Sequence, residues 1–303
     1  MQKKLFSGLG VALVTPMKNG KVDFPALEKI TELVIEGGVD YLVVLGTTGE
    51  SVTLDAKECR AVFDCVLAVN GGRKKMVAGY FGENDTRMAI ERINAFDFKG
   101  FDGILSSSPA YSKPSQEGIY QHYIKIADAS KVPVILYNVP GRTASNLLPE
   151  TTLRLADHPN ICATKEAKGD IIQASQIIKN APDNFTVLSG DDPTAVGFMA
   201  CGGDGLISVI GNALPQETAD MIHAAQAGDF KLASELHLAM LDYHAPLYAD
   251  GNPCGIKGLL NILGLCETEV RLPLVSLQSS TQEKLKTIWK TYEAKKKTSL
   301  MMG

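Results

Sequence analysis

A charged residue continues an apolar run at Lys165. The residues before it, Ile161 to Thr164, are apolar or β-branched, as expected of an interior strand. Since strand side chains alternate between two faces, Ile161, Ala163 and Lys165 are predicted to share one face. Burying an ammonium group is strongly unfavourable unless something compensates it. Two explanations stay open: a structural ion pair, for example with Glu166, or a functional amine.

The functional explanation is imine chemistry. A primary amine attacks a carbonyl carbon only when neutral, and an ordinary lysine, with a pKa of about 10.4, is almost fully protonated at neutral pH. Burial and a nearby cation lower such a pKa, and Arg142 is the predicted cation. Imine formation also requires proton transfers, for which Tyr137 is the predicted carrier, with Thr47 and Tyr111 as a relay.

The stretch GTTGE (46–50) suits a small carboxylate, because a tight turn there presents backbone N–H groups beside the hydroxyls of Thr47 and Thr48. Each candidate also has a plainer explanation. Tyr137 alone is typical of a core tyrosine, the two threonines of an ordinary turn, and Arg142 of an exposed loop charge. The elements that carry these residues must therefore decide whether they meet.

Short apolar runs recur along the chain, each followed by a polar or glycine-rich turn. The eight runs span residues 10–16, 41–50, 75–82, 102–111, 132–143, 161–167, 185–192 and 204–212. Most are separated by about 30 residues, the length of one β-α unit. Helical patterns fill the intervals, with Asp23 and Ser115 as predicted N-caps and Gly37 as a stop signal.

Alternating strands and helices predict a parallel sheet, and continuous apolar strands predict that both of its faces are covered. Eight units fit a closed (β/α)8 barrel, a TIM barrel of the α/β class. A doubly wound open sheet is the alternative, but the first strand lacks a glycine-rich phosphate turn after it. We expect a barrel over 1–228 carrying the active site, and a C-terminal helical domain over 229–303.

In such barrels the active site lies at the carboxyl ends of the strands. The candidates above all occupy predicted strand ends: Thr47 and Thr48, Tyr111, Tyr137 and Arg142, and Lys165. Two further strand ends carry SGDD (189–192) and ISVIG (207–211). The barrel prediction therefore favours a shared pocket over scattered structural roles.

Composition excludes several classes of protein. The net charge of −4, with 30 basic and 34 acidic residues, argues against nucleic-acid binding. No apolar run reaches the length of a membrane helix, and the first apolar stretch is expected to be a strand rather than a signal sequence. The six cysteines form no metal or redox motif and are predicted to be buried thiols in a reducing cytoplasm.

Five motifs in this order make the chain similar to a known family. They are GTTGE (46–50), YNVPGRT (137–143), KEA (165–167), LSGDD (188–192) and GGDGLISV (202–209). Together they resemble the dihydrodipicolinate synthase / N-acetylneuraminate lyase family of pyruvate-dependent class I aldolases, and the resemblance covers nearly the whole chain. Arg142 and the sequence GTTGE favour the synthase branch, which acts in lysine biosynthesis through diaminopimelate, over the sugar-acid lyases.

The resemblance implies roles for these residues. Lys165 corresponds to the lysine that forms a Schiff base with pyruvate, and Tyr137 to the tyrosine that relays protons. Thr47 links that tyrosine to a second one, Tyr111, which reaches the active site of an adjacent subunit. Thr48 corresponds to the residue that holds the pyruvate carboxylate.

The remaining implied roles concern the second substrate and the assembly. Arg142 corresponds to the residue that receives the carboxylate of L-aspartate 4-semialdehyde, and Gly190 and Ile207 to backbone contributors near the lysine. The resemblance implies no metal or organic cofactor. It also implies a homotetramer built as a dimer of dimers.

The chain departs from the family where feedback-inhibited members bind L-lysine. Ala110 replaces an aromatic residue, and Ala56, Cys59 and Met88 replace polar or charged ones, whereas Ser51 and Asn84 match. Because a zwitterion needs paired polar partners, we expect weak inhibition by L-lysine or none.

Two other functions remain as alternatives. The nearer one is a sugar-acid lyase of the same family. The more distant one is a non-catalytic relative that binds a small keto acid.

Overall fold

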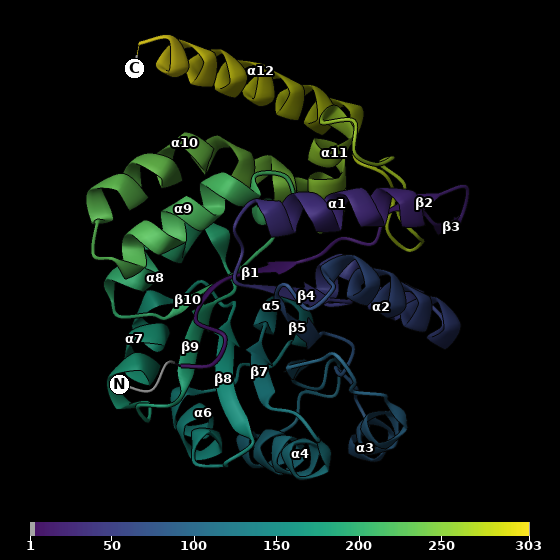
Figure 1. The fold of residues 1–303 in the computed structure, drawn as a ribbon. Coiled ribbons are helices and arrows are strands. Elements are labelled where there is room, and N and C mark those ends of the chain that lie inside the picture. The colour runs from purple at the N-terminus through teal and green to yellow at the C-terminus, as the bar shows by residue number, and fades with distance from the viewer. Residues whose placement is uncertain (1–3, 303) are drawn as a thin grey trace.

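The computed structural model describes residues 4–302, with side chains up to residue 296. Eight parallel strands close into a barrel, in the order β1-β10-β9-β8-β7-β6-β5-β4 (Figure 1). These strands are β1 (Gly8–Ala12), β4 (Tyr41–Val44), β5 (Lys75–Ala78), β6 (Gly103–Ser107), β7 (Val134–Asn138), β8 (Ile161–Glu166), β9 (Thr186–Ser189) and β10 (Gly205–Ser208). Each lies within or overlaps one of the eight predicted runs, so the barrel prediction is confirmed.

Helices between the strands cover the outside of the barrel (Figure 1). They are α1 (Phe24–Glu36), α2 (Ala56–Asn70), α3 (Thr86–Ala95), α4 (Gln116–Ala129), α5 (Pro140–Thr143), α6 (Pro149–Ala156), α7 (Ile171–Asn180), α8 (Ala195–Ala200) and α9 (Pro215–Gln226). The predicted caps are confirmed: the side chain of Asp23 accepts a hydrogen bond from Ala26 N, and that of Ser115 from Gly118 N.

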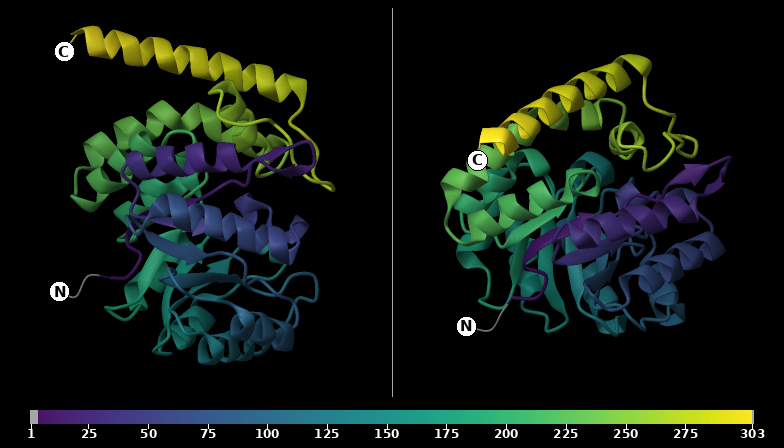
Figure 2. Two further views of the ribbon diagram at one scale, coloured as in Figure 1. Left: turned by 45° about the vertical axis from the view of Figure 1, so that its right-hand side comes forward. Right: turned by 45° about the horizontal axis from the view of Figure 1, so that its top comes forward.

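Three helices follow the barrel: α10 (Phe230–Ala249), α11 (Cys254–Ile262) and α12 (Ser279–Met302). They lie together along one side of the barrel, with α12 outermost (Figure 2). Helix α10 packs against α8 and α9. The proposed division at residues 228 and 229 falls in the turn between α9 and α10, and the division into two domains stays a prediction.

Two cores hold the barrel together. The larger lies between the strands and the surrounding helices, and the smaller fills the barrel interior with side chains such as Tyr41, Ile135, Ala163 and Leu188. Strand side chains alternate between these two cores, as expected of a parallel barrel whose strands are covered on both faces.

One local prediction was wrong. Ile161 belongs to the outer core, not to the interior face shared by Ala163 and Lys165, and Cys162 packs against the interior instead. The ladder between β7 and β8 changes register at Val134 and Ile135, which inserts one extra residue into β8. Such an irregularity shifts the alternation by one position. A two-stranded hairpin, β2 (Met17–Lys18) and β3 (Lys21–Val22), was also not predicted.

The six cysteines are all free, but they are not all buried. Cys59, Cys254 and Cys266 are buried, Cys65 and Cys162 are half-buried, and Cys201 is exposed. Cys201 is the C-cap residue of α8 and begins the turn that follows this helix. Burial raises the pKa of Cys59 to about 11 and that of Cys266 to about 12, which keeps these thiols protonated and unreactive.

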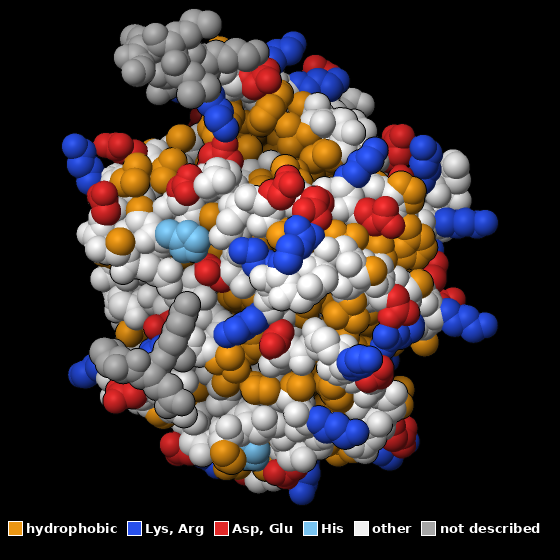
Figure 3. Space-filling model, in the orientation of Figure 1, with side chains coloured by type: hydrophobic (Ala, Val, Ile, Leu, Met, Phe, Trp, Pro, Cys, Tyr) orange, Lys and Arg blue, Asp and Glu red, His pale blue; other side chains and the backbone are white. Residues whose placement is uncertain are grey.

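The surface carries both signs of charge. On the face drawn in Figure 3, lysine and arginine side chains are interspersed with aspartate and glutamate rather than gathered in one block. Within residues 4–302, no helix is long and apolar enough to cross a bilayer.

Candidate active site

Lys165 lies inside the barrel near the carboxyl end of β8, with 5% of its surface exposed. Its Nζ lies 4.4 Å from the centre of the Tyr137 ring, which β7 presents at the directly paired position. In the described part of the chain, no carboxylate lies within ion-pair distance of this ammonium group. Lys165 is therefore a buried amine beside a phenol, free of an acidic partner.

The alternative of an ion pair with Glu166 is excluded by the alternation of β8. Glu166 points away from the barrel interior and accepts hydrogen bonds from Asn138 Nδ2 at 2.9 Å and from Gln173 Nε2 at 2.8 Å. The backbone N–H of Lys168 donates to it as well, at 2.9 Å. Burial raises the pKa of Glu166, and these donors oppose that shift. Glu166 thus ties β8 to its neighbours and leaves Lys165 unpaired.

Gly190 forms the wall against which Lys165 lies. A Cβ atom at Gly190 would stand 2.7 Å from Lys165 Cε and 2.7 Å from Ala167 Cβ, closer than real contacts allow. Its backbone N–H donates to the carbonyl of Glu166 at 2.8 Å, which fixes the start of the loop after β9. Glycine is therefore required here by the close approach of the lysine side chain.

The GTTGE stretch forms a tight turn after β4, the 3-10 helix η1 (Thr47–Gly49). The hydroxyl of Thr15 donates to the carbonyl of Gly49 at 2.7 Å, and a Cβ at Gly49 would stand 3.2 Å from the carbonyl oxygen of Leu13. The turn is thereby pressed against the end of β1. In the described residues, the backbone N–H groups of Thr47 and Thr48 have no acceptor, so they are available to an anion.

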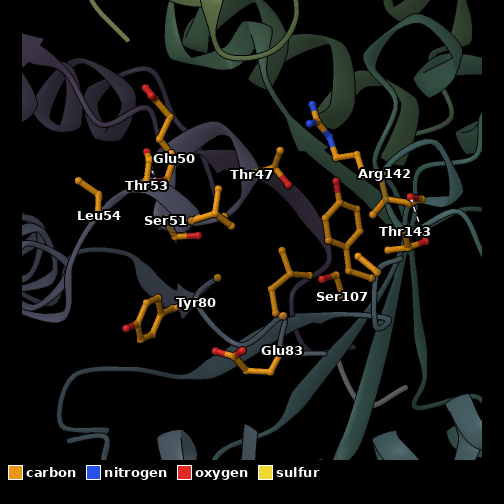
Figure 4. A pocket seen from close by; sticks show the side chains of 18 of the residues that line it. Thr47, Glu50, Ser51, Thr53, Leu54, Tyr80, Glu83, Ser107, Arg142 and Thr143 are labelled. Atoms are coloured by element: carbon orange, nitrogen blue, oxygen red, sulfur yellow. Dashed lines mark hydrogen bonds between the residues drawn. The ribbon is translucent and has the colours of Figure 1, made fainter. Parts of the chain in front are cut away.

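Arg142 lies on α5, the single turn of helix that follows β7, and makes no ion pair within the described residues. Figure 4 shows Arg142 and Thr47 on one side of the pocket, with Tyr80 and Glu83 on the opposite side. Arg142 thus lines the pocket as an exposed guanidinium without an ion-pair partner among the described residues. Such a group binds carboxylates through two parallel hydrogen bonds.

Two adjoining cavities, of about 430 Å³ and about 650 Å³, make up the site. The smaller is lined by the predicted residues Thr47, Thr48, Tyr137, Arg142, Lys165 and Gly190. Both are lined by Gly46, Thr47, Leu105, Tyr137, Val139, Arg142 and Asn252, so they form one continuous space. Each volume is in the range typical of sites for small molecules.

Two predicted site residues lie outside these cavities. Tyr111 is 92% exposed and lines neither one, although its neighbour Ala110 lines the larger. Ile207 is fully buried among the interior side chains of the barrel, on β10. The single chain thus brings Lys165 and Tyr137 together but leaves Tyr111 facing outward.

Three polar side chains with no predicted role also line the smaller cavity: Asp191, Tyr248 and Asn252. Asp191 was part of the SGDD strand end but had no assigned chemistry. Tyr248 lies in the last turn of α10 and donates a hydrogen bond to Asp192 Oδ2 at 3.3 Å. Tyr248 and Asn252 come from the C-terminal helical region. They were not predicted because only residues at the ends of barrel strands were considered as candidates.

No group of three or more His, Cys, Asp or Glu side chains among the described residues could hold a metal ion. The imine chemistry predicted from the sequence needs only an amine, a phenol and hydrogen-bond donors. That no cofactor takes part remains a prediction.

Comparison with known proteins identifies relatives along nearly the whole chain. The sequence model of the dihydrodipicolinate synthetase family matches residues 5–292. The chain is 47% identical over 283 residues to the 4-hydroxy-tetrahydrodipicolinate synthase of Parabacteroides distasonis, which covers 93% of this chain and 95% of that protein. It is 48% identical over 282 residues to the enzyme of the same name from Flavobacterium psychrophilum, covering 92% and 96%.

A solved structure shows the same fold. The chloride-inhibited dihydrodipicolinate synthase from Acinetobacter baumannii, complexed with pyruvate, superimposes with a TM-score of 0.91 at 41% sequence identity. The match covers 95% of this chain and 99% of that one.

Proposed function

The chain belongs to the dihydrodipicolinate synthetase family, and from that premise we propose that it is a 4-hydroxy-tetrahydrodipicolinate synthase. It is a lyase of the class I aldolase type, which condenses pyruvate with L-aspartate 4-semialdehyde in lysine biosynthesis through diaminopimelate. The observation that carries this function is the buried Lys165 amine beside the Tyr137 ring, inside a cavity and without an acidic partner.

Lys165 begins the reaction. Its neutral Nζ attacks C2 of pyruvate and forms a carbinolamine, whose hydroxyl leaves as water when the imine forms. Tyr137 supplies and recovers the protons of these steps, since its ring lies against the amine and Thr47 lines the same cavity.

The GTTGE turn and Arg142 hold the two carboxylates. We assign the pyruvate carboxylate to the N–H groups of Thr47 and Thr48 and to the Thr48 hydroxyl, which leaves the Thr47 hydroxyl for the proton relay. The carboxylate of the semialdehyde is assigned to Arg142. Because Gly190 has no side chain, it leaves the space that the side chain of Lys165 occupies. Ile207 stays a prediction as a backbone contributor, with its β10 position beside β9 as support.

The carbon–carbon bond forms from the enamine. Loss of a proton from the pyruvate methyl group gives the enamine, whose terminal carbon attacks the aldehyde carbon of the semialdehyde and converts that oxygen to a hydroxyl. The amino group of the second substrate then attacks the imine carbon, which closes the ring and releases Lys165 as a free amine. The overall condensation releases one molecule of water, which leaves when the first imine forms.

Mass spectrometry after incubation with pyruvate and borohydride tests this function. We expect one reduced pyruvate adduct on Lys165 in the wild-type chain and none in Lys165→Arg. Lys168→Arg is the matched control, because Lys168 is close in sequence but pairs with Asp170 outside the barrel. An unmodified Lys165 in the wild-type protein would exclude the enzymatic function in favour of keto-acid binding.

A coupled assay separates the synthase from a sugar-acid lyase. We expect turnover with pyruvate and L-aspartate 4-semialdehyde but no cleavage of N-acetylneuraminate, because the free Arg142 guanidinium matches a second carboxylate. Arg142→Ala is expected to raise the KM for the semialdehyde by at least about tenfold, as a lost charged hydrogen bond typically does.

We propose that the enzyme works as a homotetramer, a dimer of dimers, in the cytoplasm. Support for association is the exposure of two large hydrophobic side chains, Tyr111 at 92% and Val52 at 93%, near the larger cavity. Support for the compartment is the set of six free cysteines, since thiols persist in reducing surroundings.

A further inference from the structure

Asn252 reaches the catalytic cavity from outside the barrel. It lies between α10 and α11, is 8% exposed and lines both adjoining cavities. Its Nδ2 donates a hydrogen bond to Thr48 Oγ1 at 3.0 Å, across 204 residues of sequence. The C-terminal region thus touches the very turn to which the pyruvate carboxylate is assigned.

This contact determines what the Thr48 hydroxyl can do. A threonine hydroxyl has one proton to donate and two lone pairs that accept. In the contact with Asn252 the hydroxyl oxygen is the acceptor, so the hydroxyl proton of Thr48 takes no part in that hydrogen bond. Thr48 is 2% exposed, and its hydroxyl donates to no acceptor within the described residues. The proton is therefore available to an anion in the cavity.

The other end of the Asn252 amide supports the same conclusion. Its Oδ1 is buried and receives no hydrogen bond from any described residue. Pyruvate carries no N–H or O–H group at neutral pH, so it cannot satisfy this oxygen either. Asn252 consequently acts on pyruvate through the donor side of its amide, which is the side that contacts Thr48.

A buried ion pair fixes the position of the C-terminal region, and with it Asn252, relative to the GTTGE turn. Lys257, on α11 and fully buried, donates to Glu50 Oε1 and to the carbonyl of Glu269. Glu50 closes the GTTGE turn and also accepts from Arg271 N at 3.1 Å. The turn is thus joined to the C-terminal segment at two places, which limits how far Asn252 and Thr48 can separate.

We propose that Asn252 is a positioning residue for pyruvate. By donating to Thr48 Oγ1, it directs the Thr48 hydroxyl proton toward the carboxylate of the bound keto acid. This inference rests on the proposed synthase function and deepens it, because it makes a residue of the C-terminal helical region part of the first-substrate site.

Steady-state kinetics of Asn252→Ala and Asn252→Asp provide the first test. We expect the KM for pyruvate to rise about tenfold in Asn252→Ala, with kcat and the KM for the semialdehyde changed less than about twofold. The rise is expected to be larger in Asn252→Asp, whose carboxylate accepts the Thr48 proton and repels the substrate anion. If Asn252→Ala fails to fold, the Asp variant, which has the same shape, carries this test.

Asn261→Ala is the matched control. Asn261 lies on α11 and donates to the carbonyl of Cys266 at 2.9 Å, but lines neither cavity. Its loss loosens the same region without touching Thr48, so the KM for pyruvate should stay at the wild-type value. An equal rise in both variants would show that Asn252 is merely structural and would overturn the inference.

A double-mutant cycle with Thr48→Val gives the decisive result. If Asn252 acts through the Thr48 hydroxyl, Asn252→Ala should change the KM for pyruvate by less than about twofold once that hydroxyl is absent. Additive effects, or a wild-type KM in Asn252→Ala, would refute the inference while leaving the synthase function intact. Failure of the synthase function itself would appear separately, as a wild-type chain without a borohydride-trapped adduct on Lys165.

Discussion

Lys165 shows how one residue depends on the shape of its neighbours. Its amine is held by close contacts with the Tyr137 ring and the Gly190 wall rather than by an ion pair. An acidic partner would stabilise the ammonium form and suppress attack on a carbonyl carbon. Most buried lysines are held by a carboxylate. Here, packing against Tyr137 and Gly190 holds the side chain of Lys165 instead.

Gly190→Ala is predicted to impair catalysis through this contact. The added Cβ would meet both Lys165 Cε and Ala167 Cβ at 2.7 Å, so the lysine must move. We expect the rate of imine formation with pyruvate to fall at least about tenfold, since small misplacements of a reacting group carry large effects. The measurement is the rate of borohydride trapping at saturating pyruvate.

Gly197→Ala is the control for that substitution. Gly197 lies on α8, and a Cβ there would have no other atom within 4 Å apart from its helical neighbours. Trapping should proceed at the wild-type rate. A Gly190→Ala variant that is trapped equally fast would show that the wall does not position the amine.

Regulation also depends on individual residues. Ser51, Asn84 and Ala110 line the larger cavity, while Cys59 lines a separate pocket of about 480 Å³ beside it. Arg92, whose guanidinium pairs with Glu83 and lies 4.2 Å from the centre of the Tyr80 ring, borders both spaces. Because Glu83 neutralises this guanidinium, neither side chain offers an unpaired charge to a zwitterionic ligand.

L-lysine is therefore predicted to bind weakly or not at all. Isothermal titration calorimetry should show no saturable heat at micromolar concentrations, and the coupled assay should show no inhibition there. Because the amino acid lacks paired partners at Ala56, Cys59 and Met88, its charges would remain poorly solvated. Tight binding with inhibition would contradict this prediction.

At the scale of elements, an ion pair fastens the segment between α11 and α12 to α2. Arg271 forms a bidentate contact with Glu58, the residue that completes the capping box of α2 with Asp55. The hydrogen bonds from Arg271 lower the pKa of Glu58 to about 2, from an ordinary 4.5. The charged carboxylate therefore stabilises the fold above pH 4.5, and this contribution is lost as the pH falls toward 2.

Glu58→Gln tests this linkage while keeping a capping-box residue at the position. At neutral pH we expect the free energy of unfolding in urea to fall by up to about 1 kcal/mol, as for other partly exposed ion pairs. The difference from wild type should shrink as the pH is lowered from 4.5 toward 2. Glu28→Gln, an exposed glutamate of α1 without an ion pair in the described structure, should show little difference at either pH.

At the scale of the whole molecule, one chain does not complete the predicted relay. Tyr111 is exposed and lines neither of the two cavities that form the site, whereas Lys165, Tyr137 and Thr47 share one. If Tyr111 serves a second copy, each mixed dimer of Lys165→Ala and Tyr111→Phe chains contains one complete site. Co-expression of these two variants is then predicted to restore activity that each lacks or nearly lacks alone.

The pair Lys165→Ala and Tyr137→Phe is the control for this complementation. Both residues belong to the same cavity of one chain, so no mixed dimer can contain a complete site. Activity is measured in the coupled assay, and association by analytical ultracentrifugation. Restoration in the control, or none in the test pair despite dimer formation, would contradict a role for Tyr111 across subunits.

The sequence alone determined the barrel and the core of the catalytic site. Strand runs, caps and glycine stops are local signals, because each records how a segment fits its own element. Strand ends converge in any parallel barrel, so Lys165, Tyr137, Thr47 and Arg142 could be placed in one pocket before the structure was known.

The tertiary structure alone decided which residues from distant segments join that pocket. The contact of Asn252 with Thr48 spans 204 residues, and that of Lys257 with Glu50 spans 207, so no local sequence pattern predicts either contact. The register change in β8 likewise moved Ile161 to the outer face, because pairing with β7 rather than the sequence of β8 sets the alternation there. Contacts between elements depend on how the whole chain packs, and a pattern within one element carries no information about them.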